Sequence, residues 1–165
     1  MSLLVLSLGS NLGETSSTNG RKSNLDRAIE LLLENGMKIE NKSSIYETEP
    51  VGFKPQPKFL NIVLSAQTKH SPQVCLKIIH QIESELNRIR TIKNGPRTID
   101  LDIIFYDNSI IFEKDLVIPH PRMHQRAFVL KPLAEILPDY FHPVYNKTVN
   151  QLLQEIDTKG VKIWS

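Results

Sequence analysis

The order of the apolar patterns along the chain constrains its fold more than any other feature of the sequence. A short apolar run or strict alternation is typical of a strand, and apolar residues spaced three and four apart are typical of a helix. In chain order, the patterns lie at residues 3–8 (strand), 23–36 (helix), 38–46 and 59–68 (strands), 71–89 (helix) and 99–105 (strand). This is the order of the split βαβ, or ferredoxin-like, arrangement. We therefore predict an α+β fold, with a mostly antiparallel sheet and helices packed on its faces.

Local signals mark the ends of the two predicted helices. Ser23, with Asp26 three positions later, fits a capping box, and Gly36 fits a helix C-terminus. Ser71 followed by Pro72 is typical of the first turn of a helix. We therefore expect the first helix to begin at Ser23 and the second at Pro72.

The last third of the chain is predicted to form shorter elements. They are, in order, a turn at 107–108, a hairpin strand at 110–112 returning beside the strand before it, short helices and turns at 119–143, a helix at 148–156 and a strand at 161–164. The sequence contains no repeat or linker that would divide it. We therefore expect a single domain over residues 1–165.

Composition and charge narrow the classes of function. The chain has 165 residues, of which 40% are hydrophobic and 23% charged, and its formal net charge is +2. So small a charge gives no support to nucleic-acid binding, and no apolar run reaches the length of a membrane span. Cys75, the only cysteine, cannot form an internal disulfide, which fits a reducing compartment. We expect a cytoplasmic monomer with neither a nucleic-acid nor a membrane partner.

Two acids interrupt an otherwise ordinary strand in the stretch GPRTIDLDIIFYD, residues 95–107. Side chains alternate along a strand, so Asp100 and Asp102 point the same way, with Cα atoms roughly 6–7 Å apart. The opposite face is predicted to carry Ile99, Leu101, Ile103 and Phe105. Paired carboxylates favour hard cations such as Mg²⁺, and two ions held together can clamp phosphoryl groups. The alternative is a solvent-facing strand with two acids on its wet side.

Arginines gather near this acid pair. Arg88 and Arg90 end the second predicted helix, Arg97 precedes the strand, and Glu83 lies on the helix face of Arg90. Guanidinium groups suit phosphate oxygens, so a phosphate site is one interpretation. The other is a solvated helix end, where cations are favoured by the helix dipole.

Two further stretches contain candidate ligand-binding residues. In IPHPRMHQRAF, residues 118–128, His120 and Arg126 can donate hydrogen bonds to oxyanions. In YETEPVGFKPQPKFLN, residues 46–61, an aromatic and an amide can bind a planar heterocycle through Phe59 and Asn61. The alternatives are a loop histidine, a core phenylalanine and an asparagine that satisfies backbone groups.

Taken together, these stretches resemble one family. GPRTIDLDIIFYD is similar to the signature of the 6-hydroxymethyl-7,8-dihydropterin pyrophosphokinases of folate biosynthesis. LGSNLG, YETEPVG, FLN and IPHPRMHQRAFVLKPLAEI resemble the other blocks of that family in the right order, from about residue 3 to residue 137. The resemblance implies a ferredoxin-like transferase that moves the pyrophosphoryl unit of ATP to the hydroxymethyl group of the dihydropterin, with AMP leaving.

The resemblance also implies roles for individual residues. The metal ligands would be Asp100 and Asp102, holding two Mg²⁺ ions, and the catalytic arginines would be Arg88 and Arg97. The nucleotide-site positions are Glu83, Arg90, Ile103, His120 and Arg126. The pterin-site positions are Thr48, Glu49, Val51, Phe59, Asn61 and Phe128, with Phe59 and Phe128 as the two stacking faces.

Two other functions remain open at this point. A non-catalytic ferredoxin-like module could bind nucleotide or RNA, although its strands contain no aromatic block of the RNA-binding type and the acid pair would have no role in it. A kinase transferring a single phosphoryl group is the third possibility. It would release ADP, so the identity of the product separates it from the first.

Overall fold

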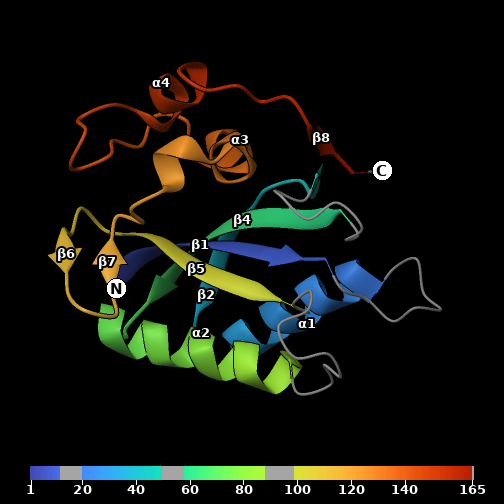
Figure 1. Ribbon diagram of the computed structural model, residues 1–165. Coiled ribbons are helices and arrows are strands. Elements are labelled where there is room, and N and C mark those ends of the chain that lie inside the picture. The colour runs from blue at the N-terminus through green and yellow to red at the C-terminus, as the bar shows by residue number, and fades with distance from the viewer. Residues whose placement is uncertain (12–19, 50–57, 88–98, 165) are drawn as a thin grey trace.

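The computed structural model describes residues 1–11, 20–49, 58–87 and 99–164, and these form an α+β fold around one main sheet (Figure 1). Its strands are β1 (Ser2–Ser10), β2 (Lys38–Lys42), β3 (Tyr46–Thr48), β4 (Phe59–Thr68), β5 (Asp100–Tyr106) and β8 (Val161–Ile163). The order across the sheet is β5-β1-β4-β3-β8, and β2 also pairs with β4. Every pairing in it is antiparallel, which confirms the predicted fold class.

Helices cover both faces of this sheet. On one face lie α1 (Gly20–Glu34) and α2 (Pro72–Asn87), and on the other lie α3 (Ala127–Ile136) and α4 (Val149–Gln154), above the sheet in Figure 1. The short 3-10 helix η1 (Met123–Gln125) leads into α3. None of the helices in the described residues is both long and apolar enough to span a membrane.

The two faces of β1 explain where the core ends and the site begins. Leu4, Leu6 and Leu8 point into the core beneath α1 and α2. On the opposite face Val5 packs into the core beneath α3 and α4, but the next positions on that face are Ser7 and Gly9. The layer of α3 and α4 therefore covers only part of its face of the sheet, and β1 presents Ser7 and Gly9 in the uncovered part.

A bulge in β5 changes which way Phe105 points. Val5 pairs with Phe105 and Leu6 with Ile103, which leaves Ile104 as an extra residue. Leu101 and Ile103 face α1 and α2 as predicted, whereas Phe105 packs with Ile104 in the core on the Asp face. The prediction that Phe105 shares a face with Leu101 is therefore wrong, because strict alternation ends at the bulge.

Three other local predictions also need correction. The first helix begins at Gly20, and Asp26 forms an ion pair with Lys22 at 2.8 Å instead of completing a cap at Ser23. The predicted strand at 38–46 is divided into β2 and β3. Residues 110–112 do not return beside β5, because β6 (Ile111–Phe112) pairs with β7 (Val117–Ile118) in a separate ribbon.

The remaining boundaries are close to the prediction. The helix α1 stops before Gly36, whose φ of 83° suits glycine, and α2 begins at Pro72. The helix α4 begins after Thr148, which forms a capping box with Gln151. The helix α4 and the strand β8 thus lie where the sequence predicted them.

His142 makes the stability of this fold sensitive to acid. Its side chain is buried, and its Nδ1 accepts hydrogen bonds from the backbone N–H groups of Val144 and Tyr145. Burial, and then the nearby charge of His124, lower the pKa of His142 to about 4. Stability from the neutral ring is therefore complete above the unfolded pKa of about 6.5 and is lost as the pH falls toward 4.

We predict that this histidine alone removes about 3 kcal/mol of unfolding free energy between pH 7 and pH 4, since each pKa unit is worth about 1.4 kcal/mol. Urea unfolding at pH 7, 5 and 4 would measure the loss. His142→Asn keeps an acceptor but does not titrate, and should show a shallower pH dependence, whereas His80→Asn on the exposed face of α2 should match the wild type. An identical slope in His142→Asn would contradict this assignment.

Candidate functional site

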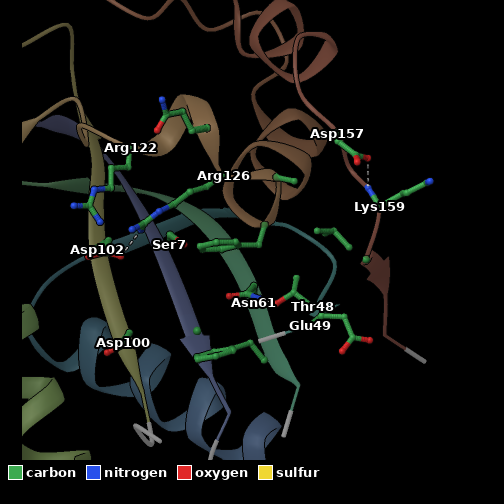
Figure 2. Close-up of a pocket in the computed structure, with 17 residues that line it drawn as sticks. Ser7, Thr48, Glu49, Asn61, Asp100, Asp102, Arg122, Arg126, Asp157 and Lys159 are labelled. Atoms are coloured by element: carbon green, nitrogen blue, oxygen red, sulfur yellow. Dashed lines mark hydrogen bonds and ion pairs between the residues drawn. The ribbon is translucent and has the colours of Figure 1, made fainter. Parts of the chain in front are cut away.

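A cavity of about 900 Å³ lies over the uncovered part of the sheet. Its floor comes from β1, β4 and β5, its roof from η1 and α3, and its far wall from the end of β3 and the start of β8 (Figure 2). The lining residues are Ser7, Gly9, Thr48, Glu49, Phe59, Asn61, Asp100, Asp102, Arg122, Gln125, Arg126, Ala127, Phe128, Asp157, Lys159, Gly160 and Val161.

The acid pair lies at the β5 side of this cavity. Asp100 is opposite Gly9 and Asp102 opposite Ser7 in the pairing of β5 with β1, and both carboxylates line the cavity. The side chain of Asp102 is 45% exposed, and its Oδ2 lies 3.9 Å from Nη1 of Arg126. This separation exceeds hydrogen-bond length, so Asp102 stays accessible to a ligand in the cavity.

The C-terminal half of α2 holds the start of β5 from the opposite face. Glu83 Oε2 accepts a hydrogen bond of 3.0 Å from the backbone N–H of Leu101, which lies between the two acids. Asn87 both donates to the carbonyl of Ile99 and accepts from its N–H. These contacts fix the backbone on either side of Asp100, so β5 can carry acids although aspartate is poorly suited to strands.

Cationic side chains lie above the acid pair. Arg122 and Arg126 both line the cavity, and Figure 2 shows them on the same side of it as Asp102. The backbone N–H of His120 donates to the carbonyl of Ile104, the extra residue of the bulge, at 3.0 Å. The bulge therefore anchors the segment that brings the arginines over β5.

His120 is held as a neutral ring. Its Nδ1 accepts a hydrogen bond of 3.1 Å from the backbone N–H of Arg122, which places the proton of the neutral ring on Nε2. Burial lowers the pKa of His120, and the nearby arginines act in the same direction, whereas Asp102 raises it. His120 can therefore donate one hydrogen bond from Nε2 at neutral pH.

The β3 side of the cavity contains aromatic and amide groups. Phe59 enters from β4 and Phe128 from α3, and the guanidinium carbon of Arg126 lies 5.5 Å from the centre of the Phe128 ring. Asn61 Nδ2 donates a buried hydrogen bond of 2.8 Å to Thr48 Oγ1. This bond fixes the amide orientation and leaves Asn61 Oδ1 as an acceptor.

Gly9 allows Asn61 its position. A Cβ at residue 9 would lie 2.9 Å from Asn61 Oδ1, closer than side chains tolerate. We predict that Gly9→Ala displaces the amide and weakens ligand binding at the β3 side of the cavity about fivefold, because a buried hydrogen bond is worth roughly 1 kcal/mol. Calorimetric titration with the dihydropterin that the family resemblance implies would measure the change. Ser2→Ala, at the far end of β1, is the matched control, and equal affinity of Gly9→Ala and wild type would refute the role of Gly9.

The structure brings together eight of the residues singled out from the sequence. Thr48, Glu49, Phe59, Asn61, Asp100, Asp102, Arg126 and Phe128 all line the cavity. Three of the predicted residues do not line the cavity: Glu83, Ile103 and His120. Glu83 holds the backbone of β5, and the Ile103 side chain is buried beneath α1 and α2. Val51, Arg88, Arg90 and Arg97 lie outside the described residues.

Sequence reasoning missed several lining residues. Arg122 stands between His120 and Arg126 in a stretch already recognised as dense in possible phosphate contacts, so that stretch offered a signal for it. Ser7 and Gly9 could have been found as the small residues on the outer face of β1. No sequence signal could have identified Asp157, Lys159 and Gly160, since only the pairing of β8 with β3 brings them to the cavity.

The two carboxylates of β5 are suited to a cation only if a bound molecule supplies further ligands. Within the described residues, no three His, Cys, Asp or Glu side chains converge as a metal-binding group. Two carboxylates on one strand face offer hard oxygen ligands, and Mg²⁺ is commonly held by one or two carboxylates with substrate phosphates supplying other ligands. The pair therefore suits Mg²⁺ that arrives with a polyphosphate.

Comparison with known proteins identifies a family. Residues 5–138 match the model of the 7,8-dihydro-6-hydroxymethylpterin-pyrophosphokinase (HPPK) family. The chain is 39% identical over 160 residues to a Bacillus subtilis protein named 2-amino-4-hydroxy-6-hydroxymethyldihydropteridine pyrophosphokinase, covering 96% of this chain and 88% of that protein. It is 44% identical over 157 residues to the folic acid synthesis protein fol1 of Pneumocystis carinii, covering 95% of this chain but only 20% of that protein.

Solved structures agree on the fold. The chain resembles the crystal structure of wild-type HPPK-DHPS from Plasmodium falciparum with a TM-score of 0.72 and 19% identity, covering 93% of this chain and 44% of that one. An HPPK-DHPS structure in complex with substrates gives a TM-score of 0.74 at 19% identity, and the match covers 93% of this chain and 43% of that one. The chain thus spans less than half of these HPPK-DHPS chains and about a fifth of the Pneumocystis carinii protein.

Proposed function

Because the chain belongs to the 7,8-dihydro-6-hydroxymethylpterin-pyrophosphokinase family, we propose that it transfers the β,γ-pyrophosphoryl group of ATP to 6-hydroxymethyl-7,8-dihydropterin. The pterin hydroxyl releases its proton to solvent as its oxygen bonds to Pβ, the bond from Pβ to the oxygen it shares with Pα breaks, and AMP leaves. One observation carries the proposal: a single cavity joins a carboxylate pair to an aromatic and amide pocket. Such transfers depend chiefly on positioning and charge stabilisation.

The pterin ring is assigned to the β3 side of the cavity. Phe59 and Phe128 would stack against its two faces, as their positions in the floor and the roof allow. Asn61 Oδ1 would accept from the ring N–H groups, since Nδ2 is already bonded to Thr48. The family resemblance adds Glu49 and Val51 to this pocket.

The ATP phosphates are assigned to the β5 side. Asp100 and Asp102 would hold two Mg²⁺ ions, with phosphate oxygens as further ligands. Mg²⁺ held by these carboxylates would neutralise phosphate charge and polarise the attacking hydroxyl. The 3.9 Å gap between Arg126 and Asp102 leaves the guanidinium able to turn toward a phosphate.

The other nucleotide-site residues are proposed to act in different ways: through a side chain, through the backbone or by supporting β5. His120 would donate from Nε2, and Arg122 would add a second guanidinium on the side of Arg126. Ile103 would contact ATP through its backbone, because its side chain lies in the core. Glu83 would act by holding β5. The roles of Arg88, Arg90 and Arg97 rest on the family resemblance alone.

Consumption of ATP tests this proposal against a binding module. We expect ATP to disappear only when both the hydroxymethyl-dihydropterin and Mg²⁺ are present. Excess EDTA should stop the reaction, and added Mg²⁺ should restore it. A pterin lacking the hydroxymethyl group is the matched control and should bind without consuming ATP. Tight ATP binding with no pterin-dependent consumption would favour the non-catalytic alternative.

A further inference from the structure

We propose that Arg21 of α1 is a positioning residue that holds the pterin end of the cavity in shape from outside it. Arg21, Glu47 and Lys58, here called the clasp, join α1 to the end of β3 and to the residue before β4. None of the three lines the cavity, but Thr48 and Phe59, which do, are their immediate neighbours in the chain. The consequence for pterin binding rests on the function proposed above.

The clasp centres on one nitrogen. Nη1 of Arg21 donates to Glu47 Oε2 at 3.1 Å and to the backbone carbonyl of Lys58 at 2.7 Å. The Arg21 and Glu47 side chains are 20% and 30% exposed, so the pair is more sheltered than a surface ion pair. A second link reinforces it, since Nζ of Lys58 lies 3.2 Å from Oε1 of Glu49.

The pairing of the two strands shows what the clasp controls. The strand β3 has three residues and pairs with β4 through Tyr46 with Asn61, Glu47 with Leu60 and Thr48 with Phe59. Thr48 and Phe59 form the last pair, and strand ends fray when little supports them. Loss of this pair would move the Phe59 ring and break the bond from Asn61 to Thr48.

Side-chain alternation explains how the clasp can act without entering the cavity. Thr48 points into the cavity, so Glu47 beside it points to the other face, where α1 lies. Arg21 therefore reaches the two strand ends from the helix side. It would set the spacing of the ligand-facing residues and leave the phosphate end, which is built on β5 and η1, unaffected.

A variant of Arg21 with a matched control tests this inference. Arg21→Met keeps most of the side-chain length but removes the donors, and Arg27→Met does the same to an exposed pair on α1, Arg27 with Glu30 at 2.9 Å. We expect Arg21→Met to raise the KM for the pterin about tenfold, with the KM for ATP and kcat within twofold of wild type. Arg21→Lys should recover part of the loss, and Arg27→Met should change none of these values. Unchanged pterin KM in Arg21→Met, or an equal rise for both substrates, would overturn the inference.

Hydrogen exchange separates this inference from the proposed function. In the free protein, Arg21→Met should speed amide exchange at residues 46–48 and 59–61 about tenfold, without effect at β5, and Arg27→Met should not. Unchanged exchange would refute the clasp whatever the activity. A wild-type protein that shows clasp-dependent protection but no pterin-dependent turnover would refute the proposed function instead.

Discussion

Asp102→Asn is expected to lower kcat by about 10³-fold or more, since the charge stabilisation that metal ligands bring to such a transfer is worth several kcal/mol and each 1.4 kcal/mol is tenfold in rate. Asparagine keeps the shape of the side chain but loses the negative charge that would hold Mg²⁺. Because Asp102 is 45% exposed and 3.9 Å from Arg126, we expect the free energy of unfolding to change by less than about 1 kcal/mol. Initial rates at saturating ATP and pterin, with urea unfolding in parallel, would measure both.

The control for this variant is Asp115→Asn, an exposed acid in the turn between β6 and β7 that should behave as wild type. The combination of lost turnover and retained stability is what distinguishes a metal ligand from a structural acid. A kcat within threefold of wild type in Asp102→Asn would refute the two-metal assignment. A loss of activity accompanied by unfolding would show that Asp102 supports the fold instead.

Phe105→Ala is expected to lower the free energy of unfolding by about 3–5 kcal/mol, the usual cost of emptying a buried phenylalanine site. The Phe105 side chain is fully buried, its ring centre lies 4.8 Å from that of Tyr140, and the ring of His142 packs edge-on against it at 5.8 Å. Phe105 thereby joins β5 to the segment after α3, on the face that carries the acid pair. Urea unfolding at pH 7 with linear extrapolation would measure the loss.

Phe112→Ala is the matched control, because Phe112 is 90% exposed on the β6–β7 ribbon and its loss should cost less than about 0.5 kcal/mol. If Phe105 instead faced α1 and α2, as strict alternation predicts, its removal would be equally costly. A double variant that combines Phe105→Ala with Val129→Ala, in the core beneath α3, distinguishes the two orientations. The two losses in unfolding free energy are expected to be non-additive only if both side chains share a core. Full additivity would contradict the bulge.

Local patterns predicted the side-chain directions correctly in the first part of β5, which carries the acids, but not after the bulge. Asp100, Asp102, Leu101 and Ile103 point as alternation requires, since they precede the bulge. The bulge at Ile104 comes from pairing with β1 and from the hydrogen bond that His120 donates to Ile104, neither of which leaves a mark in the local sequence. Register set by distant partners is therefore what the pattern could not predict.

The same reasoning explains the other differences. Ser23 and Asp26 satisfied a capping pattern, but the helix continues back to Gly20, and Arg21 in this extra turn reaches the ends of β3 and β4. Of the eight predicted residues in the cavity, five were recognised from local motifs, and Thr48, Glu49 and Phe128 were named through the family resemblance. The turn before β8 joins the cavity only through tertiary pairing, so no motif could reveal it.

The most direct test of the account is the identity of the products when ATP, Mg²⁺ and 6-hydroxymethyl-7,8-dihydropterin are mixed with the protein and followed by ³¹P NMR. We predict that AMP and a pterin diphosphate appear in equal amounts, which would show transfer of the pyrophosphoryl unit as a whole. ADP with a pterin monophosphate would contradict this account and indicate single phosphoryl transfer. No change in the ATP signals over many hours would contradict catalysis altogether.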